Sequence, residues 1–554
     1  MIKKTISLAL TLALFISLVP LNSFAADADF VVMNGVLVKY QGSDPVVTLP
    51  ANLTAIADKA FNGNSFVEGV IIPGTVKTIG DAAFQDCSNL RTVSIKDGSL
   101  TTISANAFLN CKRLSSVNIP NTTKTIGANA FQATISLKNI ILPNGLTTIG
   151  NSAFQMSAID KLTIPDSVTS IGSNAFAGDI YLPAINIGAN NGEYNSYDGV
   201  LYSKWATRLL QYPAGKTGAY KIPDGVTSIE DGAFLDSRSL TAVTIPNSVT
   251  NIGNSAFSGC TSLTTVALPS SVKNLGSRIF SDCTALKDVI IPGGVSKIDY
   301  ESFYNCKSLI NLVLADGIES IGANAFLGCP SLVSVTIPGS VKYFGSQAFD
   351  SVSLKKINGI PGSVAQNFAA ITKVPFADAN TVADWAKASL AQINATGLVP
   401  ETLQTLYTAY ATRAEFAALV IPILERKLGP IDISGTTARD TTDVNILKCK
   451  AAGIMSGDGE FMNPNGIMTR AMAAVILTNT ARTLGFDDKT ADLEAKFSDY
   501  SSFPEWAKPY IEYVVGWGLM VGDGQNFTPN TYFDRLICII VFKSLSDLST
   551  TIQE

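Results

Sequence analysis

The sequence predicts a β-rich solenoid of parallel coils followed by an α-helical region, and three observations carry this prediction. A phenylalanine returns about every 23 residues along two thirds of the chain. Most of these phenylalanines share one frame, which Ile252–Pro269 (IGNSAFSGCTSLTTVALP) and Ile321–Pro338 (IGANAFLGCPSLVSVTIP) show in full. After Pro375 the period gives way to a helical pattern in three segments of about 55 residues. A fixed period in this range is typical of stacked coils that bury their apolar faces against their neighbours.

Length and composition narrow the possible functions. The chain has 554 residues, 46% of them hydrophobic and 15% charged, with a net charge of −5. No run of Lys or Arg follows the first four residues, so we expect no nucleic-acid partner. The chain contains no His, which excludes Ser-His-Asp and Cys-His nucleophiles and His-based zinc sites. We therefore expect no catalytic residue, no metal and no cofactor.

The first 25 residues have the pattern of a secretory signal peptide. Lys3 and Lys4 are followed by the apolar stretch Ile6–Val19, and Ser23-Phe24-Ala25 offers small residues for cleavage before Ala26. The apolar stretch Leu536–Phe542 is too short to span a bilayer. We expect a secreted protein without a transmembrane segment.

Each solenoid coil is predicted to be mostly β. In the last full copy, Leu332, Val335 and Ile337 alternate with polar residues and point inward, and Pro338 stops the strand. The Gly of the frame is expected at a tight bend, and the Phe fills the core. The repeat phenylalanines are Phe61, Phe84, Phe108, Phe131, Phe154 and Phe176, then Phe234, Phe257, Phe280, Phe303, Phe326 and Phe349.

Six cysteines lie three residues after a repeat phenylalanine: Cys87, Cys111, Cys260, Cys283, Cys306 and Cys329. Disulfides would suit a secreted protein. A ladder of small buried thiols explains the positions better, because Thr134, Ser157 and Ser237 fill the same slot. Cys449 and Cys538 are expected to be buried in helices.

One face of the coils is predicted to bind a partner. Its outward strand positions carry no charge, which suits a protein strand, a neutral glycan or a second copy of the chain. The alternative is that β-branched and small residues simply form good sheet. The positions of this partner-binding face are Ile71, Asn118, Ile141, Thr163, Thr244, Ile290, Val313 and Thr336.

About 45 residues, 178–222, separate the two runs of coils and are rich in Tyr. Asp198-Gly199-Val200-Leu201-Tyr202 resembles Asn34-Gly35-Val36-Leu37-Val38 near the N-terminus. The insert is predicted to be an internal hairpin that extends the solenoid. An aromatic patch that stacks on sugars or docks a partner is the alternative.

The repeat resembles the BspA-like leucine-rich repeats of bacterial surface proteins. The resemblance covers residues 50–358 and rests on a dozen copies that agree at Ile-Gly, Ala-Phe and Leu. It implies a solenoid domain over residues 26–374, with a hairpin cap near Met33–Tyr40 and a closing segment at Gly362–Pro375.

The three helical segments share motifs in a fixed order. Phe-x-Asp and Trp-Ala open the first and third segments, at Phe376 and Phe497. A Gly-Asp-Gly turn followed by Phe and Pro occurs in the second and third. Each segment closes on a helix that starts at Thr412-Arg413-Ala414-Glu415, Thr469-Arg470-Ala471-Met472 or Asp534-Arg535-Leu536-Ile537. These segments look like S-layer homology (SLH) domains, here called the first (376–429), second (433–486) and third (497–548) copies.

That resemblance implies non-covalent attachment to secondary cell-wall polysaccharide, often pyruvylated and anionic, on a Gram-positive-type cell. It also implies a pseudo-threefold bundle of the three copies with the glycan in its grooves. The residues that it assigns to glycan binding are Asp378, Trp385, Thr412, Arg413, Glu415, Gly457, Thr469, Arg470, Asp499, Trp506, Gly522 and Arg535.

The arginines at the helix starts are the most informative of these residues. Thr412 and Glu415 form a capping box, but an Arg in the first turn opposes the positive end of the helix dipole. A bound carboxylate would turn that conflict into an anion site. The alternative is an Arg that pairs with a neighbouring Asp or Glu. The first copy lacks the Gly-Asp-Gly turn and the second lacks Phe-x-Asp, where Asp440 or Asp443 are possible substitutes, so not every groove need function.

The function expected from the sequence is therefore a wall-anchored surface protein whose solenoid binds an unknown protein or glycan in adhesion. A structural wall or S-layer component is the alternative. A carbohydrate-active enzyme is disfavoured, because glycoside hydrolysis needs two carboxylates across a cleft and the repeats leave no separate catalytic domain.

Overall fold

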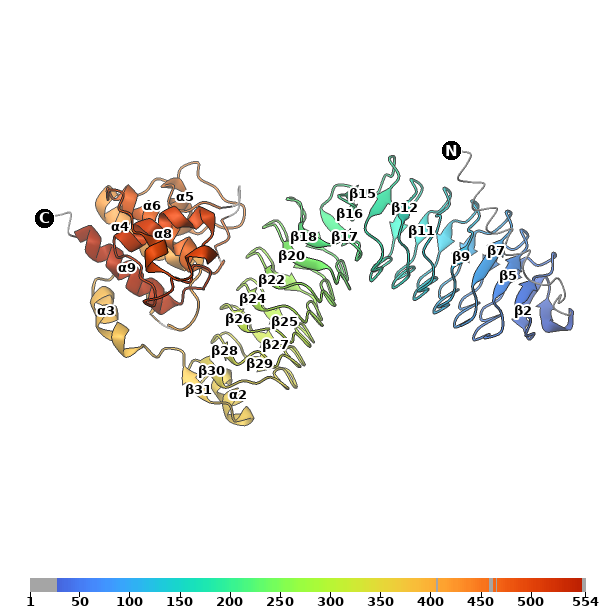
Figure 1. The fold of residues 1–554 in the computed structure, drawn as a ribbon, viewed down its shortest axis with the longest axis horizontal. Helices are drawn as coiled ribbons and strands as arrows, with labels where there is room; N and C mark the ends of the chain where they lie inside the picture. The colour runs from blue at the N-terminus through green and yellow to red at the C-terminus, as the bar shows by residue number, and fades with distance from the viewer. Residues whose placement is uncertain (1–26, 405–406, 458–461, 465, 551–554) are drawn as a thin grey trace. The chain divides into compact units, whose positions relative to one another are not determined.

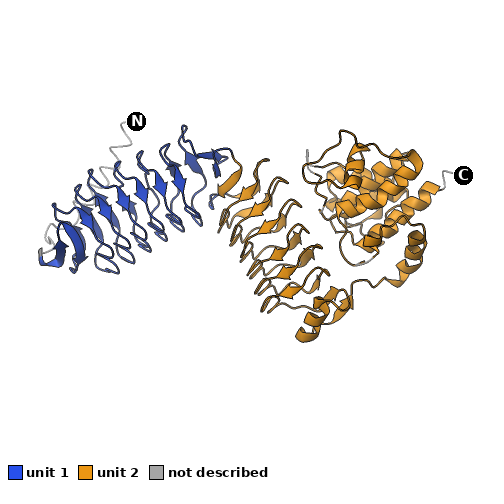
Figure 2. Cartoon of the chain, turned by 180° about the vertical axis from the view of Figure 1, so that it is seen from behind, with its two compact units in different colours: residues 1–205, 211–216 blue, residues 206–210, 217–554 orange. Residues whose placement is uncertain are grey.

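The computed structural model describes residues 27–404, 407–457, 462–464 and 466–550 (Figure 1). The predicted signal peptide lies outside these residues. The chain divides into two compact units, one of residues 1–205 and 211–216 and the other of residues 206–210 and 217–554 (Figure 2). The first unit holds the first run of coils, and the second unit holds the second run and the helical region.

The first unit begins with a hairpin, as the sequence predicts. Strands β1 and β2 pair antiparallel around Asn34 and Gly35, whose φ values of 52° and 78° suit the tight turns that match strand twist. Parallel two-residue strands continue this sheet, one from each coil. The sheet contains β1 (Phe30–Met33), β2 (Val36–Tyr40), β4 (Ala55–Ile56), β6 (Thr78–Ile79), β8 (Thr102–Ile103), β10 (Thr125–Ile126), β11 (Thr148–Ile149) and β13 (Ser170–Ile171).

The predicted inward-and-outward strands form a second face of the coils. Parallel pairing keeps equivalent residues side by side, so Val47, Val70 and Val93 form one buried column. In the first unit these strands are β3 (Val46–Thr48), β5 (Gly69–Ile72), β7 (Thr92–Ile95) and β9 (Ser116–Val117), then β12 (Leu162–Ile164) paired with β14 (Ile185–Ile187).

The repeat phenylalanines stack in two ladders inside the coils. Ring centroids of successive members lie 4.7–5.7 Å apart, and all but the last ring are fully buried. Two residues per coil, one two positions before and one two positions after each Phe, have a positive φ, as Ser152 (52°) and Met156 (55°) do around Phe154. These turns let the N–H of each Phe except the last of a run donate to the next coil, for example from Phe131 to the carbonyl of Ala153.

The recurring Gly of the frame has a different role from the one predicted. It does not adopt a left-handed conformation; instead it lies against the backbone of the preceding coil. A Cβ at Gly127 would come within 2.5 Å of the Ala105 nitrogen, and one at Gly150 within 2.4 Å of the Ala128 nitrogen. Close approach of the coils therefore selects Gly, while the bends fall on the positive-φ positions beside the Phe.

The six repeat cysteines are free and buried. Each Sγ donates to the carbonyl of the Phe in the preceding coil, as in Cys283 to Phe257 at 3.1 Å and Cys329 to Phe303 at 3.1 Å. Thr134, Ser157 and Ser237 are buried in the same slot. Asp179 also occupies this slot, at the end of the first run, where its Oδ1 accepts from the Ser157 amide and hydroxyl at 2.6 and 2.9 Å.

The insert contains the predicted hairpin. Strands β15 (Tyr194–Tyr197) and β16 (Val200–Ser203) pair antiparallel around Asp198 and Gly199, which have φ values of 51° and 77° like the N-terminal turn. Tyr202 and Tyr212 are buried, whereas Tyr181, Tyr197 and Trp205 are exposed.

The second run repeats the same two faces within the second unit. The two-residue face contains β17 (Arg208–Gln211), β19 (Ser228–Ile229), β21 (Asn251–Ile252) and β23 (Asn274–Leu275), then β25 (Lys297–Ile298), β27 (Ser320–Ile321) and β29 (Tyr343–Phe344). The other face contains β18 (Gly218–Lys221), β20 (Leu240–Thr244), β22 (Thr265–Ala267), β24 (Asp288–Ile291) and β26 (Asn311–Leu314), then β28 (Ser334–Thr336), β30 (Lys356–Gly359) and β31 (Phe376–Asp378). Helix α2 (Val364–Thr372) ends the stack, with Phe368 packed 5.7 Å from Phe349.

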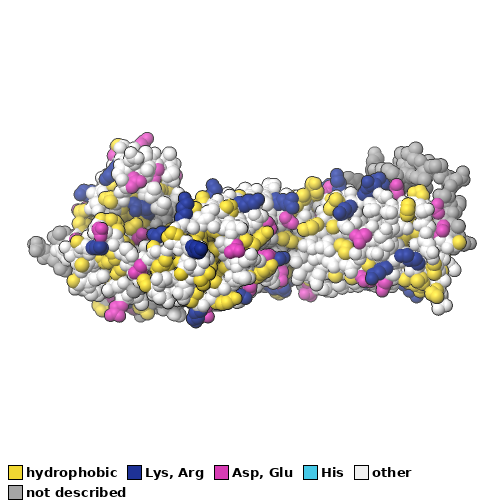
Figure 3. Space-filling model, turned by 90° about the horizontal axis from the view of Figure 1, so that it is seen from below, with side chains coloured by type: hydrophobic (Ala, Val, Ile, Leu, Met, Phe, Trp, Pro, Cys, Tyr) yellow, Lys and Arg dark blue, Asp and Glu magenta, His cyan; other side chains and the backbone are white. Residues whose placement is uncertain are grey.

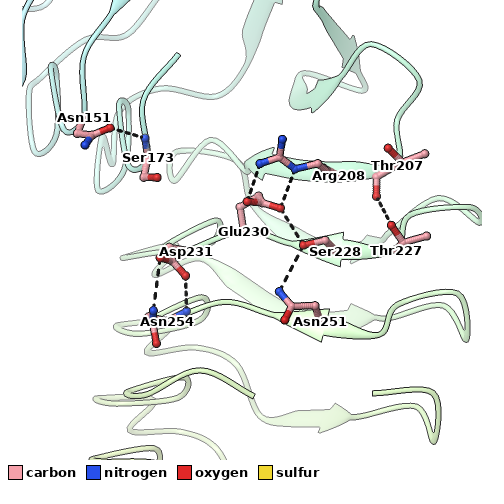
Figure 4. Close-up of polar contacts among 10 residues, drawn as sticks. All are labelled: Asn151, Ser173, Thr207, Arg208, Thr227, Ser228, Glu230, Asp231, Asn251 and Asn254. Atoms are coloured by element: carbon pink, nitrogen blue, oxygen red, sulfur yellow. Dashed lines mark hydrogen bonds and ion pairs between the residues drawn. The ribbon is translucent and has the colours of Figure 1, made fainter. Parts of the chain in front are cut away.

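Polar side chains also repeat from coil to coil at the edge of the sheets (Figure 4). In the second run, Asp231 accepts from the amide and the side chain of Asn254, and Arg208 forms a two-pronged ion pair with Glu230. In the first run, Asn151 accepts from the Ser173 amide. These three contacts each join residues 22 or 23 positions apart, in neighbouring coils, as the contacts of the core do.

The helical region has its own hydrophobic core, whose described buried residues lie between Ala386 and Leu545. Its longer helices are α3 (Asp384–Ala395), α4 (Arg413–Leu428), α5 (Val444–Ala451), α6 (Arg470–Thr483), α8 (Lys508–Gly516) and α9 (Arg535–Thr550), with the single turn α7 (Leu493–Lys496) between copies. The first helix of each copy packs on the second helix of another: α5 on α4, α8 on α6 and α3 on α9. The three copies therefore interlock.

One predicted element lies elsewhere. Phe376–Asp378, assigned above to the first helical copy, forms the last strand of the solenoid, with Ile357 opposite Phe376 in parallel register. The Asp378 carboxylate accepts from the Asn380 amide at 2.8 Å and closes a local turn. The solenoid therefore extends a few residues past Pro375.

Candidate functional site

The three helix starts of α4, α6 and α9 are joined by a closed ring of backbone hydrogen bonds. Met468 donates to the carbonyl of Ala411 at 2.9 Å, Phe533 donates to Met468 at 2.8 Å, and Ala411 donates to Phe533 at 2.8 Å. These residues precede the helix-start arginines by the same two positions. A second set repeats the relation, with the amides of Arg413, Arg470 and Arg535 donating to the carbonyls of Gly466, Thr531 and Ala409.

Each helix start is capped by the predicted residue. Thr412 and Glu415 form the capping box, with Glu415 Oε2 accepting from the Thr412 amide at 2.9 Å. Thr469 Oγ1 accepts from the Met472 amide at 3.2 Å, and Asp534 Oδ1 accepts from the Ile537 amide at 2.7 Å. Burial raises the pKa of Asp534 to about 6.

The guanidinium groups of Arg413 and Arg470 hold the Gly-rich turn of the following copy. Arg413 donates from Nε to the Met462 carbonyl at 2.9 Å and from Nη2 to the Ser456 carbonyl at 2.7 Å. Arg470 repeats both bonds in the third copy, from Nε to Phe527 at 2.7 Å and from Nη2 to Val521 at 2.6 Å. The guanidinium of Arg470 also lies over the Phe527 ring, 4.6 Å from its centroid.

A carboxylate holds the same turn from its other side. Asp499 accepts from the amides of Phe527 and Thr528 at 2.9 and 2.8 Å. In the second copy Asp440 accepts from the equivalent amides, Met462 and Asn463, at 2.8 and 2.6 Å. Asp440 is therefore the residue that replaces Phe-x-Asp in this copy.

The glycine of each turn stands beside the carbonyl that the arginine binds. Gly457 follows Ser456 and is exposed. Gly522 follows Val521, and a Cβ there would lie 2.2 Å from the Asn526 carbonyl oxygen and 2.5 Å from the Phe497 ring. Asp523 then accepts from the amides of Asn526 and Gln525, and these bonds lower its pKa. No side chain larger than hydrogen fits at Gly522.

Arg535 differs from the other two arginines. Its Nε and Nη2 both donate to Glu415 Oε1, at 3.1 and 2.6 Å, and Asp316 in the same compact unit lies 3.0 Å from Nη2. Only 8% of the Arg535 side chain is exposed. This is the ion pair that the sequence left open as an alternative to an anion site.

The direction of the pKa shift also distinguishes Arg413 and Arg470 from Arg535. Burial lowers the pKa of Arg413 and of Arg470, since neither has a carboxylate within ion-pair distance among the described residues. Burial also acts on Arg535, but the Glu415 and Asp316 carboxylates outweigh it and raise its pKa. All three groups stay charged at neutral pH, because the guanidinium is a very weak acid.

The two tryptophans of the predicted site lie at the surface. Trp385 is 65% exposed and Trp506 is 55% exposed, and neither ring has an aromatic or cation contact within the described part of the chain. Their copies share a left-handed Gly at the end of the following helix, Gly397 at 69° and Gly518 at 68°. The second copy has the same Gly, Gly453, but Thr441 in the tryptophan position.

The outward strand positions of the solenoid are mostly accessible. Asn118, Ile141, Thr163 and Thr244 are exposed, Ile141 to 74%, and Ile71, Ile290 and Thr336 are half-buried. Val313 is buried, against the prediction, because residues of the helical region in the same compact unit line one hollow with it. On the face drawn in Figure 3, basic and acidic side chains are scattered among apolar and neutral ones.

The Asn118 side chain bonds to the backbone of the preceding coil, which the sequence did not indicate. Its side-chain amide donates to the Ile95 carbonyl, and its oxygen accepts from the Ile95 amide at 2.8 Å. The side chain thus replaces backbone pairing at the end of β9.

The acceptors of Arg413 and Arg470 could not be predicted from the sequence, because they are backbone carbonyls. The missing Gly-Asp-Gly turn of the first copy was the one available signal that Arg535 would differ.

The fold and these helix starts define the class of protein: a parallel β-solenoid of leucine-rich coils joined to helical surface-attachment domains. The BspA type leucine rich repeat region model matches residues 54–183, 216–314 and 296–381, and the chain belongs to this family. The S-layer homology domain model matches residues 445–474 and 496–536, in the second and third copies. SLH domains bind cell-wall polysaccharide, which indicates association with the cell surface or the S-layer. None of the described helices is both long and apolar enough to cross a membrane.

The chain is also similar to individual proteins. A leucine rich cell surface protein from Faecalibacterium prausnitzii is 27% identical, with a TM-score of 0.49 over 59% of this chain and 98% of that one. A leucine-rich repeat protein from Eubacterium ventriosum is 26% identical, with a TM-score of 0.47 over 58% of this chain and 88% of that one. Exoglucanase XynX from Acetivibrio thermocellus is 26% identical over 174 residues, which are 30% of this chain and 16% of that enzyme.

Proposed function

We propose that this is a secreted adhesion protein of a Gram-positive-type cell. Its helical region holds it non-covalently on secondary cell-wall polysaccharide, and its solenoid presents a binding surface. The observation that carries the proposal is the pair of half-buried arginines, Arg413 and Arg470, each fixed at a helix start against a Gly-rich turn of the next copy. Both turns lie in or beside the residues that match the SLH model.

The chemistry of these two positions suits an anionic glycan. Arg470 uses Nε and Nη2 to hold the turn, and its Nη1 donors have no partner among the described residues. A sugar carboxylate, such as that of a pyruvyl ketal, would accept from those donors and meet the positive end of α6. Rigid positioning by the turn carbonyls reduces the side-chain entropy lost on binding.

The same geometry supports a pseudo-threefold bundle. The closed ring of three amides and the packing of each first helix on another copy relate the copies cyclically. Grooves would then lie between successive copies, each with one copy's arginine and the next copy's turn. The first, second and third copies therefore act as a single attachment domain.

The solenoid face is proposed as the adhesive surface. Its exposed positions are neutral, and Ile141 offers an apolar side chain that is 74% exposed. Uncharged, flat strand surfaces suit a protein strand, a neutral glycan or a second copy of this chain better than a highly charged ligand.

Sedimentation with purified cell walls tests the attachment. Residues 382–554, which contain the whole helical core, should sediment with walls, and residues 26–374 should stay in solution. Walls stripped of their secondary polysaccharide should lose the binding. Equal retention of the helical region on stripped walls would show that the polysaccharide is not the ligand.

A further inference from the structure

The third helix start differs from the other two in what its arginine binds. Nε and Nη2 of Arg413 and Arg470 bind turn carbonyls of the following copy. The same two nitrogens of Arg535 bind one carboxylate oxygen, Glu415 Oε1, at 3.1 and 2.6 Å. Glu415 is therefore engaged on both oxygens, since Oε2 closes the capping box with Thr412.

Two first-copy carbonyls correspond to the acceptors of Arg413 and Arg470; one lies at position 405, outside the described residues, and the other, that of Val399, has a partner of its own. Val399 stands as far before Arg413 as Ser456 stands before Arg470 and Val521 before Arg535. The Val399 carbonyl accepts from Gln404 Nε2 at 3.0 Å, within the first copy. The first copy has no Gly-Asp-Gly turn, and the short 3₁₀ turn Glu401–Leu403 follows Val399 instead.

The burial and the ion pairs of the Arg535 side chain also argue against a ligand anion at this helix start. Only 8% of the Arg535 side chain is exposed, and the Glu415 and Asp316 carboxylates already balance its charge. A ligand anion at this guanidinium would therefore meet two nearby carboxylates and little accessible surface. Arg413 and Arg470 carry no such internal carboxylate within ion-pair distance in the described part of the chain.

We infer that the helical region has two anion-binding grooves, and that the third is closed from within by Glu415 and Gln404. This inference rests on the proposed function, because it concerns the number of sites for the same ligand. Of the twelve residues predicted to bind glycan, those that contact it would then lie at two interfaces, one between the first and second copies and one between the second and third copies. Arg535 becomes a structural residue that locks the third copy onto the first.

Calorimetric titration of the full chain counts the sites. The probe is a short pyruvylated oligosaccharide with one carboxylate per molecule. The unmodified chain should bind two equivalents, and Arg413→Ala and Arg470→Ala should each bind one. The double variant Arg413→Ala, Arg470→Ala should bind none, although Arg535 and Glu415 are intact. Thermal melts of each variant check that the region remains folded.

The outcomes distinguish failure of the closed third groove from failure of wall attachment. Three equivalents on the unmodified chain, or binding that survives in a folded double variant, would overturn the closed third groove while leaving wall attachment in place. If a variant does not fold, the count on the unmodified chain still decides. No binding by the unmodified chain, together with no sedimentation of residues 382–554 with walls, would instead reject the proposed function.

Discussion

The chain repeats itself in two ways, as a line in the solenoid and as a ring in the helical region. A coil binds the coils on either side through the Phe stack, the thiol slot and the edge ladders. A helical copy contacts both of the others, through the ring of Ala411, Met468 and Phe533. Repetition along a line tolerates an interruption, whereas repetition around a ring does not.

The two regions accordingly show their irregularities differently. The solenoid accommodates an insert of about 45 residues and changes its slot residue from Cys to Ser, Thr or Asp. In the ring, the first copy lacks the Gly-Asp-Gly turn, and at its interface with the third copy Arg535 binds the Glu415 carboxylate. An irregular coil in the solenoid affects its neighbours alone, whereas an irregular copy in the ring changes the contacts at an interface between copies.

Removing a ring from the middle of the Phe stack should have the largest effect. Phe280 is fully buried between Phe257 and Phe303, so Phe280→Ala should destabilise the second run by about 3–5 kcal/mol through lost contacts and a cavity. Urea unfolding followed by circular dichroism measures the loss. Phe349→Ala, at the end of the stack, should cost less; equal costs would mean that position in the line does not matter.

Breaking the joint of the ring should cost nearly as much. Glu415→Ala leaves Arg535 buried without its nearest carboxylate and should lower the stability of the helical region by about 3 kcal/mol. The matched change in the line, Glu230→Ala, removes an ion pair whose Arg208 is half-exposed, and should cost at most about 1 kcal/mol. Thermal melts of both variants check the contrast, and a smaller loss for Glu415→Ala than for Glu230→Ala would contradict it.

The slot at the end of the first run should make the solenoid sensitive to pH. Asp179 is fully buried, its Oδ2 has no partner among the described residues, and burial raises the pKa of its carboxyl well above the ordinary value. A raised folded-state pKa means that its stabilising protonation is complete at low pH and is lost as pH rises through the raised value.

Asp179→Asn should therefore stabilise the first run at neutral pH and lose that advantage as pH falls toward 4, near the ordinary pKa of Asp. Melting temperatures of both proteins across this range measure the difference. A constant difference between the two proteins at every pH would show that Asp179 is not the titrating group.

The smallest expected effect concerns the bends of the coils. Met156 is 45% exposed and has a φ of 55°, a conformation that costs an L-residue about 1 kcal/mol. Met156→Gly should therefore raise the stability of the first run by about that amount. Gly63 occupies the same slot with a φ of 71° and open space around it, so Gly63→Ala should have the opposite sign. Shifts of the same sign would contradict the assignment of strain to this slot.

The repeats could be predicted from the sequence because each coil experiences the same environment. The inward strand positions, the Phe core, the thiol slot and the hairpin of the insert all follow from residue type and period. The role of the frame Gly could not be predicted, since the approach of the preceding coil at Gly127 is a property of stacking. The burial of Val313 depends on another part of its unit and was equally inaccessible.

The helical site was predictable in its caps but not in its contacts. Thr412, Glu415 and Thr469 cap as their local spacing requires. The partners of the arginines come from other copies, and a backbone carbonyl carries no signal in sequence. The strand at Phe376–Asp378 was not predicted, because the pairing depends on the edge that β30 offers and Phe-x-Asp alone does not show it.

The ring itself is tested most directly by removing one copy. Hydrogen exchange of α4 and α6 should be measured in the chain truncated after Phe486, which lacks α8 and α9 but keeps the first two copies. The account predicts that both helices lose their protection, because Ala411 loses the Phe533 carbonyl, Arg470 loses its turn, and α3 loses α9. The coils of the solenoid should exchange as in the full chain. Protection of α4 and α6 that survives the truncation would show that the copies fold independently and that no ring is needed.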